Sequence, residues 1–177
     1  MSYFAAAVAR GADGWAATEL DLTGVADVDE VVDRLRDTDP EAALLLLFVE
    51  SDDSYLAIVR LDDGSDVRVF GSDAAFAEES RLGALLLGDV AGAPADTIGG
   101  AAGEPVDDED DEDDDERPAA DPDATPVGEA EILADLGVAG GRLLTLCAHE
   151  GLLPSDVTAE LCQAIGCGDE VEELREA

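Results

Sequence analysis

Four side chains near the C-terminus are of the types that bind zinc: Cys147, His149, Cys162 and Cys167. Zinc sites use thiolate and imidazole ligands, commonly with a Cys-x-x-Cys pair that brings two thiolates to one ion. Here the spacings are Cys-x-His and Cys-x4-Cys, and helical residues one or two apart do not face each other. We therefore interpret the cysteines as small buried side chains, and His149 as a residue at a helix C-terminus. We expect no metal site and no cofactor.

Other catalytic arrangements fail on similar grounds. His149, the single histidine, is followed directly by Glu150, so the two side chains cannot form a catalytic pair on one helix. The chain has no Gly-x-Ser-x-Gly segment of the kind that presents a nucleophilic serine. The glycine-rich segment 99–103 has no predicted strand before it and no predicted helix after it, unlike a phosphate-binding loop. We predict that the chain has no catalytic residues and is not an enzyme.

The charge composition predicts the class of partner. The 177 residues include 45 acidic and 9 basic side chains, giving a formal charge of −36, and every basic residue is arginine. Phosphate-binding loops of the P-loop type and Schiff-base enzymes use a lysine side chain, which this chain lacks. A polyanion also repels phosphate backbones, because nucleic-acid affinity comes largely from Lys and Arg. We expect a basic protein partner, and no direct binding of nucleic acid.

Residues 107–116 (DDEDDEDDDE) are ten consecutive carboxylates. The segment has no apolar surface to offset the entropy cost of ordering, and its charges repel one another. It lacks the glycine and the ligand spacing of an EF-hand loop. Gly, Ala and Pro dominate on both sides of it. The sequence therefore predicts a disordered acidic linker over 89–125, between an α+β domain (1–88) and a helical unit (126–177).

Nothing in the sequence predicts a targeting segment or a membrane anchor. The longest apolar run, Ala42 to Val49, has 8 residues, whereas a membrane-spanning helix needs about 20. Three cysteines are an odd number in a long chain, which fits a reducing compartment better than a disulfide framework. We expect a cytoplasmic protein.

The first domain shows strand patterns and one clear helix start. Asp27 followed by Glu30 is typical of a capping box, and opens a helix with Val31, Val32 and Leu35 on its apolar face. Ser72 or Asp73 can cap a second helix through Ala74–Glu79. Strands are predicted over residues 3–9, 15–22, 44–50, 55–61 and 67–70. The order β-β-α-β-β-β-α predicts an antiparallel five-stranded sheet with helices on one face, similar in outline to profilin-like or longin-like modules.

The C-terminal unit reads as helical. Helices are predicted over 127–136, 142–150 and 169–175, with a further one capped by Ser155 or Asp156 that places Val157, Leu161 and Ile165 on one stripe. Thr125-Pro126 suits the start of the first of these helices. About 50 residues form a marginal core on their own, so we expect this unit to dock on the first domain or on a partner.

Several segments resemble one known family. The segments are YFAAAVAR, DLTGVADVDEVVDRLRD, LLLLFVESDDSYLAIVRLDDGSDVRVFGSD and, near the end, DLGVAGGRLLTLCAHEGLLPSDVTAEL. They resemble the actinobacterial tRNA adenosine deaminase-associated proteins. The resemblance implies association with a tRNA-editing deaminase. It does not imply deaminase activity, because the deaminase signature H-x-E followed by P-C-x-x-C is missing here.

Two functions follow as hypotheses. The first is a non-catalytic acidic accessory protein that associates with a tRNA adenosine deaminase or a similar basic tRNA-handling enzyme. The alternative is a profilin-like small-ligand or signalling module, with the helical tail as a lid or a dimerisation element. The sequence leaves open the contact surface, the oligomeric state, the role of residues 107–116, and whether the association is physical or only genomic.

Overall fold

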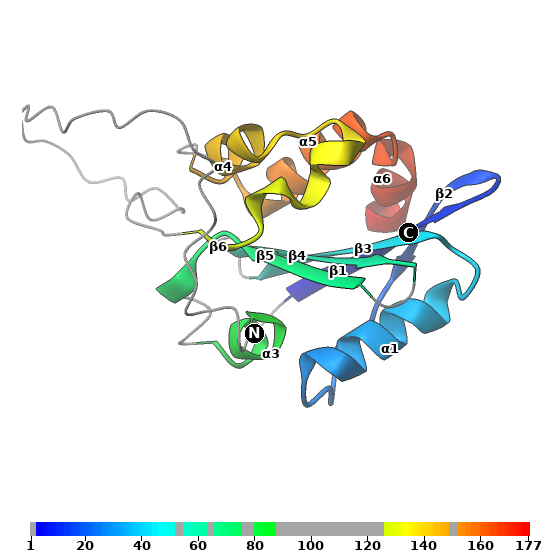
Figure 1. Ribbon diagram of the computed structural model, residues 1–177, viewed down its shortest axis with the longest axis horizontal. Helices are drawn as coiled ribbons and strands as arrows, with labels where there is room; N and C mark the ends of the chain where they lie inside the picture. The colour runs from blue at the N-terminus through cyan, green and yellow to red at the C-terminus, as the bar shows by residue number, and fades with distance from the viewer. Residues whose placement is uncertain (1–2, 52–54, 64–65, 76–79, 88–125, 149–151) are drawn as a thin grey trace, which may run out of the picture.

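A computed structural model describes residues 3–51, 55–63, 66–75, 80–87, 126–148 and 152–177. Its strands form one antiparallel sheet in the order β2-β1-β3-β4-β5-β6 (Figure 1). The strands are β1 Tyr3–Gly11, β2 Gly14–Glu19, β3 Leu44–Ser51, β4 Tyr55–Asp62, β5 Asp66–Gly71 and β6 Val127–Gly128. The helices are α1 Val28–Thr38, α3 Arg81–Leu87, the 3-10 helix η2 Ala130–Leu136, α4 Gly140–Ala148, α5 Pro154–Ile165 and α6 Gly168–Glu176. In this part of the chain, no helix is long and apolar enough to cross a membrane.

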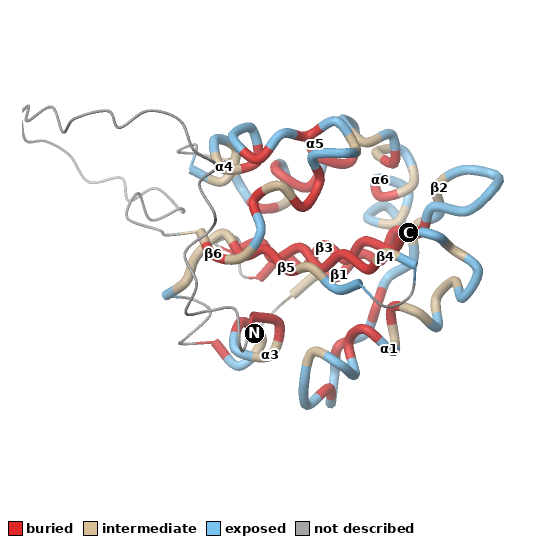
Figure 2. Tube along the Cα trace, in the orientation of Figure 1, coloured by how far each residue is buried: buried red, intermediate tan, exposed pale blue. Residues whose placement is uncertain are grey.

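The centre of the sheet is buried on both faces. Every residue of β3 is buried, and so is every residue of β4 except the last (Figure 2). Because side chains alternate along a strand, Leu45, Leu47 and Val49 point to one face, while Leu46 and Phe48 point to the other. Two separate hydrophobic cores therefore form, one on each side of the sheet.

Helices α1 and α3 cover the first face. The side chain of Asp27 accepts a hydrogen bond from the Glu30 backbone N–H at 3.0 Å, and Glu30 accepts one from the backbone N–H of Ala26 at 2.6 Å. The first contact is the one that the predicted capping box requires, while the second reaches Ala26, one residue before the N-cap Asp27. Alanines on this face of β1 (Ala5 and Ala7 among them) are buried in the same core and leave room for close packing of α1.

The C-terminal residues cover the second face. Helices η2, α4, α5 and α6 lie across the sheet from α1 and α3 (Figure 1). Leu133, Leu143 and Leu161 are completely buried against sheet residues such as Phe48 and Phe70. The C-terminal residues therefore share a core with the first 87 residues, which is one of the two outcomes expected for so small a unit.

The predicted fold class, an antiparallel α+β fold with a C-terminal helical part, is confirmed. Helix α3 covers residues 81–87, whereas the second helix of the first domain was predicted over 74–79. The sheet has six strands rather than five. Residues 127–136 were predicted as one helix. Instead, Val127 and Gly128 pair with the end of β5, and a 3-10 helix follows.

The sixth strand has a local cause. Gly128 has a φ of +87°, which a helix cannot accommodate, and the Glu129 backbone N–H donates to the Val69 carbonyl oxygen at 3.0 Å. The short strand thus covers part of the edge of β5 before the chain enters the second helical layer.

The predicted caps of the third C-terminal helix were wrong. Leu153 occupies the N-cap position of α5, Pro154 is its first helical residue, and Asp156 accepts a hydrogen bond from the Leu153 backbone N–H at 3.3 Å. Proline fits the first helical position because its missing N–H has no partner there anyway. The predicted linker 89–125, the acidic run 107–116, Thr125, and most of the predicted helix Ala74–Glu79 lie outside the described residues.

Gly128→Ala should destabilise the protein by about 2–4 kcal/mol, because a Cβ there would lie 2.1 Å from the Val69 carbonyl oxygen and the backbone φ is positive. Gly141→Ala is the matched control. Gly141 lies in α4 with open space around it, so alanine should stabilise the helix by up to about 1 kcal/mol. Urea unfolding measures both. Equal effects of the two substitutions would contradict the assigned role of β6.

Candidate functional site

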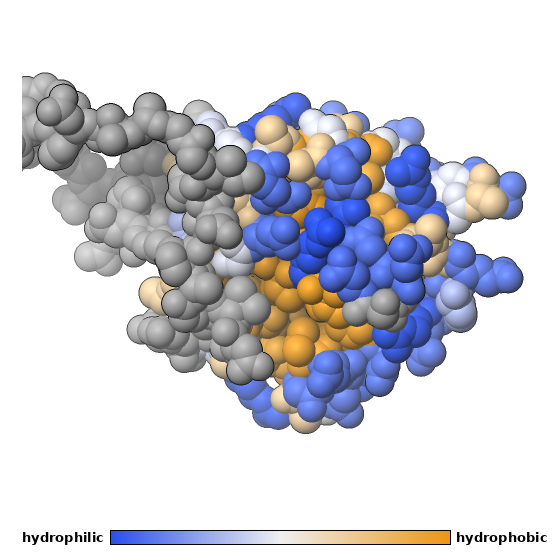
Figure 3. All heavy atoms as spheres, in the orientation of Figure 1, coloured by the Kyte–Doolittle hydropathy of each residue, from blue (hydrophilic) through white to orange (hydrophobic). Residues whose placement is uncertain are grey.

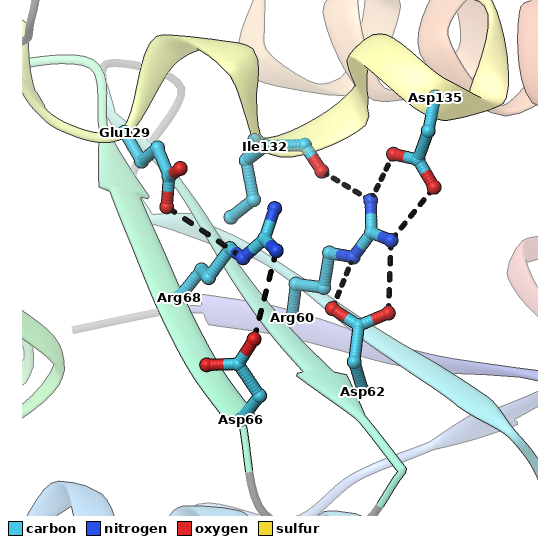
Figure 4. A network of polar contacts seen from close by, with 7 residues as sticks. All are labelled: Arg60, Asp62, Asp66, Arg68, Glu129, Ile132 and Asp135. Atoms are coloured by element: carbon cyan, nitrogen blue, oxygen red, sulfur yellow. Dashed lines mark hydrogen bonds and ion pairs between the residues drawn. The ribbon is translucent and has the colours of Figure 1, made fainter.

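A buried arginine joins the sheet to the second helical layer (Figure 4). The side chain of Arg60 on β4 is 5% exposed. Its Nε and Nη2 donate to the two carboxylate oxygens of Asp62 at 2.7 and 2.8 Å. Nη2 also donates to Asp135 at 2.8 Å, and Nη1 donates to the Ile132 carbonyl oxygen at 2.7 Å. Paired hydrogen bonds between a guanidinium and a carboxylate hold the two groups in one orientation and also stabilise their contact. They therefore fix the orientation of η2 on β4.

This contact also determines a pH dependence. The hydrogen bond from Arg60 holds the pKa of Asp135 below its ordinary value of 3.8. A carboxyl group whose pKa is lowered by folding contributes stability above its unfolded pKa and loses it as the pH falls through the folded value. The side chain of Asp135 is 58% exposed, so solvent screens this contribution and it stays small. The contact is therefore complete at neutral pH and weakens only in strong acid.

A second arginine joins the far end of the same layer. Arg175 on α6 forms an ion pair with Glu50 on β3, and its guanidinium lies 4.8 Å from the centre of the Phe4 ring. The side chain of Glu50 is only 10% exposed, so this pair is partly shielded from water. The two arginines thus connect the first and last parts of the helical layer to adjacent central strands.

The three cysteines lie in the second core or pack against it. Cys162 and Cys167 are completely buried in the second core, and Cys147 is half-buried on α4. Burial raises the pKa of Cys147 to about 12. The pKa of Cys162 is also raised, first by a hydrogen bond with Cys167 and then by burial. Protonated thiols are poor nucleophiles and poor metal ligands.

Within the described residues, no group of three or more His, Cys, Asp or Glu side chains is placed to hold a metal ion. His149 and Glu150 lie outside those residues, as does the segment 99–103. The aromatic residues that could have stacked on bases are partly buried: Tyr3 packs against the first core, and Phe4 and Trp15 against the second.

An acidic hollow lies where the β1–β2 hairpin meets the end of α1. It has a volume of about 500 Å³ and is lined by residues 11–16 together with Asp39 and Glu41. Figure 1 shows the hairpin projecting beyond the helical layers. The hollow has three acidic side chains, Asp13, Asp39 and Glu41, and its other lining residues are Trp15 and small residues of the hairpin. We call this site the hairpin hollow.

The electrostatics of the hairpin hollow favour a cation. Asp39 is the C-cap of α1, where the helix dipole already presents partial negative charge. Arg10 lies over the Trp15 ring at 5.6 Å from its centre, so one guanidinium of the chain itself already lies beside the hollow. Carboxylates beside an aromatic face can bind an Arg or Lys side chain of another protein.

The sequence did not predict the hairpin hollow, although it placed Trp15 at the start of a strand. Asp39 and Glu41 are about 26 residues distant from Asp13 along the chain, and only the fold brings them together. The Asp13-Gly14 pair is a hairpin-turn signal that could have located one wall, since Gly14 has a φ of +131°. No periodic pattern in the sequence indicated that Asp39 and Glu41 would line the same hollow.

Comparison with known proteins gives one match. A family model described as Rv3753c-like tRNA adenosine deaminase-associated protein matches residues 3–168. No curated protein and no solved structure matches the chain. The match covers the sheet, the first helical layer and the second layer up to the start of α6, and the chain belongs to this family.

Arg60→Met should lower the free energy of unfolding by about 2–3 kcal/mol, because it leaves the Ile132 carbonyl and two carboxylates without their donor. Arg68→Met is the matched control on the neighbouring strand. Arg68 is 34% exposed and lies 3.5 and 3.8 Å from Asp66 and Glu129, so its loss should cost less than about 1 kcal/mol. Urea unfolding compares the two. A smaller loss for Arg60 than for Arg68 would refute its assigned role.

Proposed function

We propose that this member of the tRNA adenosine deaminase-associated family is a non-catalytic, cytoplasmic accessory protein that binds a tRNA adenosine deaminase through its acidic surface. The family description supports association with such an enzyme. An enzyme that holds tRNA presents positive charge to the phosphate backbone. A chain with a formal charge of −36 is complementary to that surface and repels tRNA itself.

One observation carries the proposal: the positive charges of the chain are mostly used internally. Six of the eight described arginines contact the chain's own groups. Four form ion pairs with acidic side chains: Arg36, Arg60, Arg68 and Arg175. Arg34 donates to backbone carbonyls, and Arg10 lies over Trp15. The remaining carboxylates therefore face solvent without nearby compensation, which favours a cationic partner.

Within this surface, we place the first contact at the hairpin hollow. It combines three carboxylates with an aromatic wall, and it projects from the body of the molecule. A basic side chain of the deaminase would enter it, with Trp15 against its apolar stem or its guanidinium. The remaining acidic surface would accelerate encounter rather than determine the docked geometry.

The proposal predicts salt-sensitive binding of the purified tRNA adenosine deaminase from the same organism. The association rate constant should fall roughly tenfold or more between about 50 mM and about 300 mM salt, because steering fades as the Debye length shortens. Calorimetry and stopped-flow fluorescence measure affinity and rate. Absence of binding at both salt concentrations would reject direct association.

Two further variants locate the contact. Asp13→Asn with Glu41→Gln removes two charges from the hairpin hollow, while Glu160→Gln with Glu176→Gln removes two exposed charges from α5 and α6. The hollow variant should weaken binding by about tenfold and the control by less than about twofold. Equal losses would move the contact away from the hollow and leave association itself intact.

Deletion of residues 107–116 tests the acidic run. It removes ten charges from a segment with no apolar residue. We expect a slower association with the deaminase and an unchanged free energy of unfolding, because the run adds charge and no core. Unchanged association after deletion would place the whole interaction on the described surface. Chemical denaturation of both forms provides the folding control.

A further inference from the structure

The outermost strand of the sheet, β2, has one edge that no other strand of the described chain covers. It spans Gly14–Glu19 and pairs only with β1, whereas β6 closes part of the opposite edge of the sheet by pairing with β5. No residue of β2 is buried, and Figure 1 shows its hairpin projecting beyond the helical layers. The edge of β2 is therefore open to solvent.

The register of the hairpin determines which backbone groups face this edge. In an antiparallel pair, residues that exchange hydrogen bonds with the neighbouring strand alternate with residues whose N–H and C=O point away from it. Leu20 donates its backbone N–H to the Ala5 carbonyl oxygen at 2.8 Å, and the pairing runs back through β2 without a bulge. Every second residue before Leu20 is therefore turned towards β1. The backbone N–H and C=O groups of Trp15, Ala17 and Glu19 point outward.

These outward backbone groups have no hydrogen-bond partner among the described residues. Helix α6 lies against the face of β2 on which Trp15 and Ala17 pack with the second core, and it forms no hydrogen bond with the edge. The strand also lacks devices that commonly protect an edge, since its sequence GWAATE contains no proline and no lysine. A row of free donors and acceptors at the spacing of a strand matches an extended backbone.

The charges around the edge determine which extended segment fits it. Residues 11–33 include no basic residue, and Glu19 and Asp21 lie at one end of β2. The hairpin hollow, with its three carboxylates, lies at the other end. An acidic segment would be repelled at both ends, whereas arginine or lysine side chains at alternate positions of an added strand would meet carboxylates at both. The edge is thus complementary to a basic strand.

We propose that β2 pairs with an extended basic segment of the partner, which extends the sheet by one strand. Main-chain hydrogen bonds would hold the segment, and a basic side chain near one of its ends would enter the hairpin hollow. Figure 3 shows the hairpin in blue, white and tan, in contrast to the strongly hydrophobic residues gathered at the level of the sheet. Backbone pairing and charge, rather than apolar burial, would therefore provide the affinity.

This inference rests on the proposed function for the identity of the partner, a tRNA adenosine deaminase, and it adds the conformation of the bound segment. Amide hydrogen exchange of the full chain with the purified deaminase tests it. The amides of Trp15, Ala17 and Glu19 should exchange at least about tenfold more slowly in the complex than in the free chain. The amides of Ala16 and Thr18 already bond to β1 and should change less. Deaminase binding without slower exchange at the three outward amides overturns the inference and leaves the proposed function intact.

Two substitutions at one position separate the hydrogen bond from the charge. Glu19→Pro and Glu19→Gln both remove the carboxylate, but only proline removes the outward N–H. Glu19→Pro should bind the deaminase about five- to tenfold more weakly than Glu19→Gln, because one hydrogen bond with the added strand is lost. Proline is tolerated where the N–H of an edge strand faces solvent, so both variants should unfold at similar urea concentrations. Thr18→Pro removes an N–H that β1 uses and should unfold at a lower concentration. Equal affinities of Glu19→Pro and Glu19→Gln would contradict the pairing.

Synthetic peptides test the edge without the deaminase. A peptide of alternating arginine and valine, as long as β2, should bind saturably and slow exchange of the same three amides. A peptide of alternating arginine and proline has the same charge but is a poor strand former, and it should not slow them. Slower exchange with the arginine-valine peptide, in a chain that the deaminase does not bind, would reject the proposed function and retain the basic strand. The inference is overturned if the two peptides act alike, if neither binds, or if protection rises with the chain's own concentration, as pairing with a second copy requires.

Discussion

Burial of β3 and β4 on both faces is the constraint on which the rest of the structure depends. A strand such as Leu44–Ser51, whose residues are all buried, can be stable only if helices cover the sheet on each side. Helices α1 and α3 supply one cover from the first 87 residues. The second cover has to come from beyond residue 125, and the chain provides it with η2, α4, α5 and α6. The short strand β6 begins this return, and Arg60 and Arg175 fix the direction in which the returning helices lie. The C-terminal part is thus a layer of the same fold rather than an appendage.

The use of arginine explains how so acidic a chain remains folded and yet presents a strongly anionic surface. Arg60 is almost completely buried and its hydrogen bonds are satisfied by Asp62, Asp135 and the Ile132 carbonyl. A buried charge is tolerable only when it is paired and hydrogen-bonded in this way. An arginine that is paired within the fold cannot also neutralise a carboxylate on the surface. The partner that we propose, a positively charged deaminase, would therefore meet complementary charge on this surface.

Much of the fold could be predicted because the local signals agreed with the final packing. The apolar run 44–49 indicated a central strand, and the Asp27–Glu30 capping box marked the start of α1 within a residue. The sixth strand could not be predicted, since two residues carry no periodicity and β6 forms by pairing with the distant strand β5. The same reason explains the hairpin hollow: Asp13 and Asp39 line one hollow only because the β1–β2 hairpin and the end of α1 meet in the fold. Their spacing in the sequence does not indicate this.

One further consequence follows from strand β2, which forms the outer edge of the sheet and has no buried residue. An outer strand with free backbone groups ordinarily invites a second molecule to extend the sheet. Here a second molecule would bring the same −36 charge to the same edge. Repulsion between identical copies would therefore oppose this extension of the sheet and the aggregation that it could start.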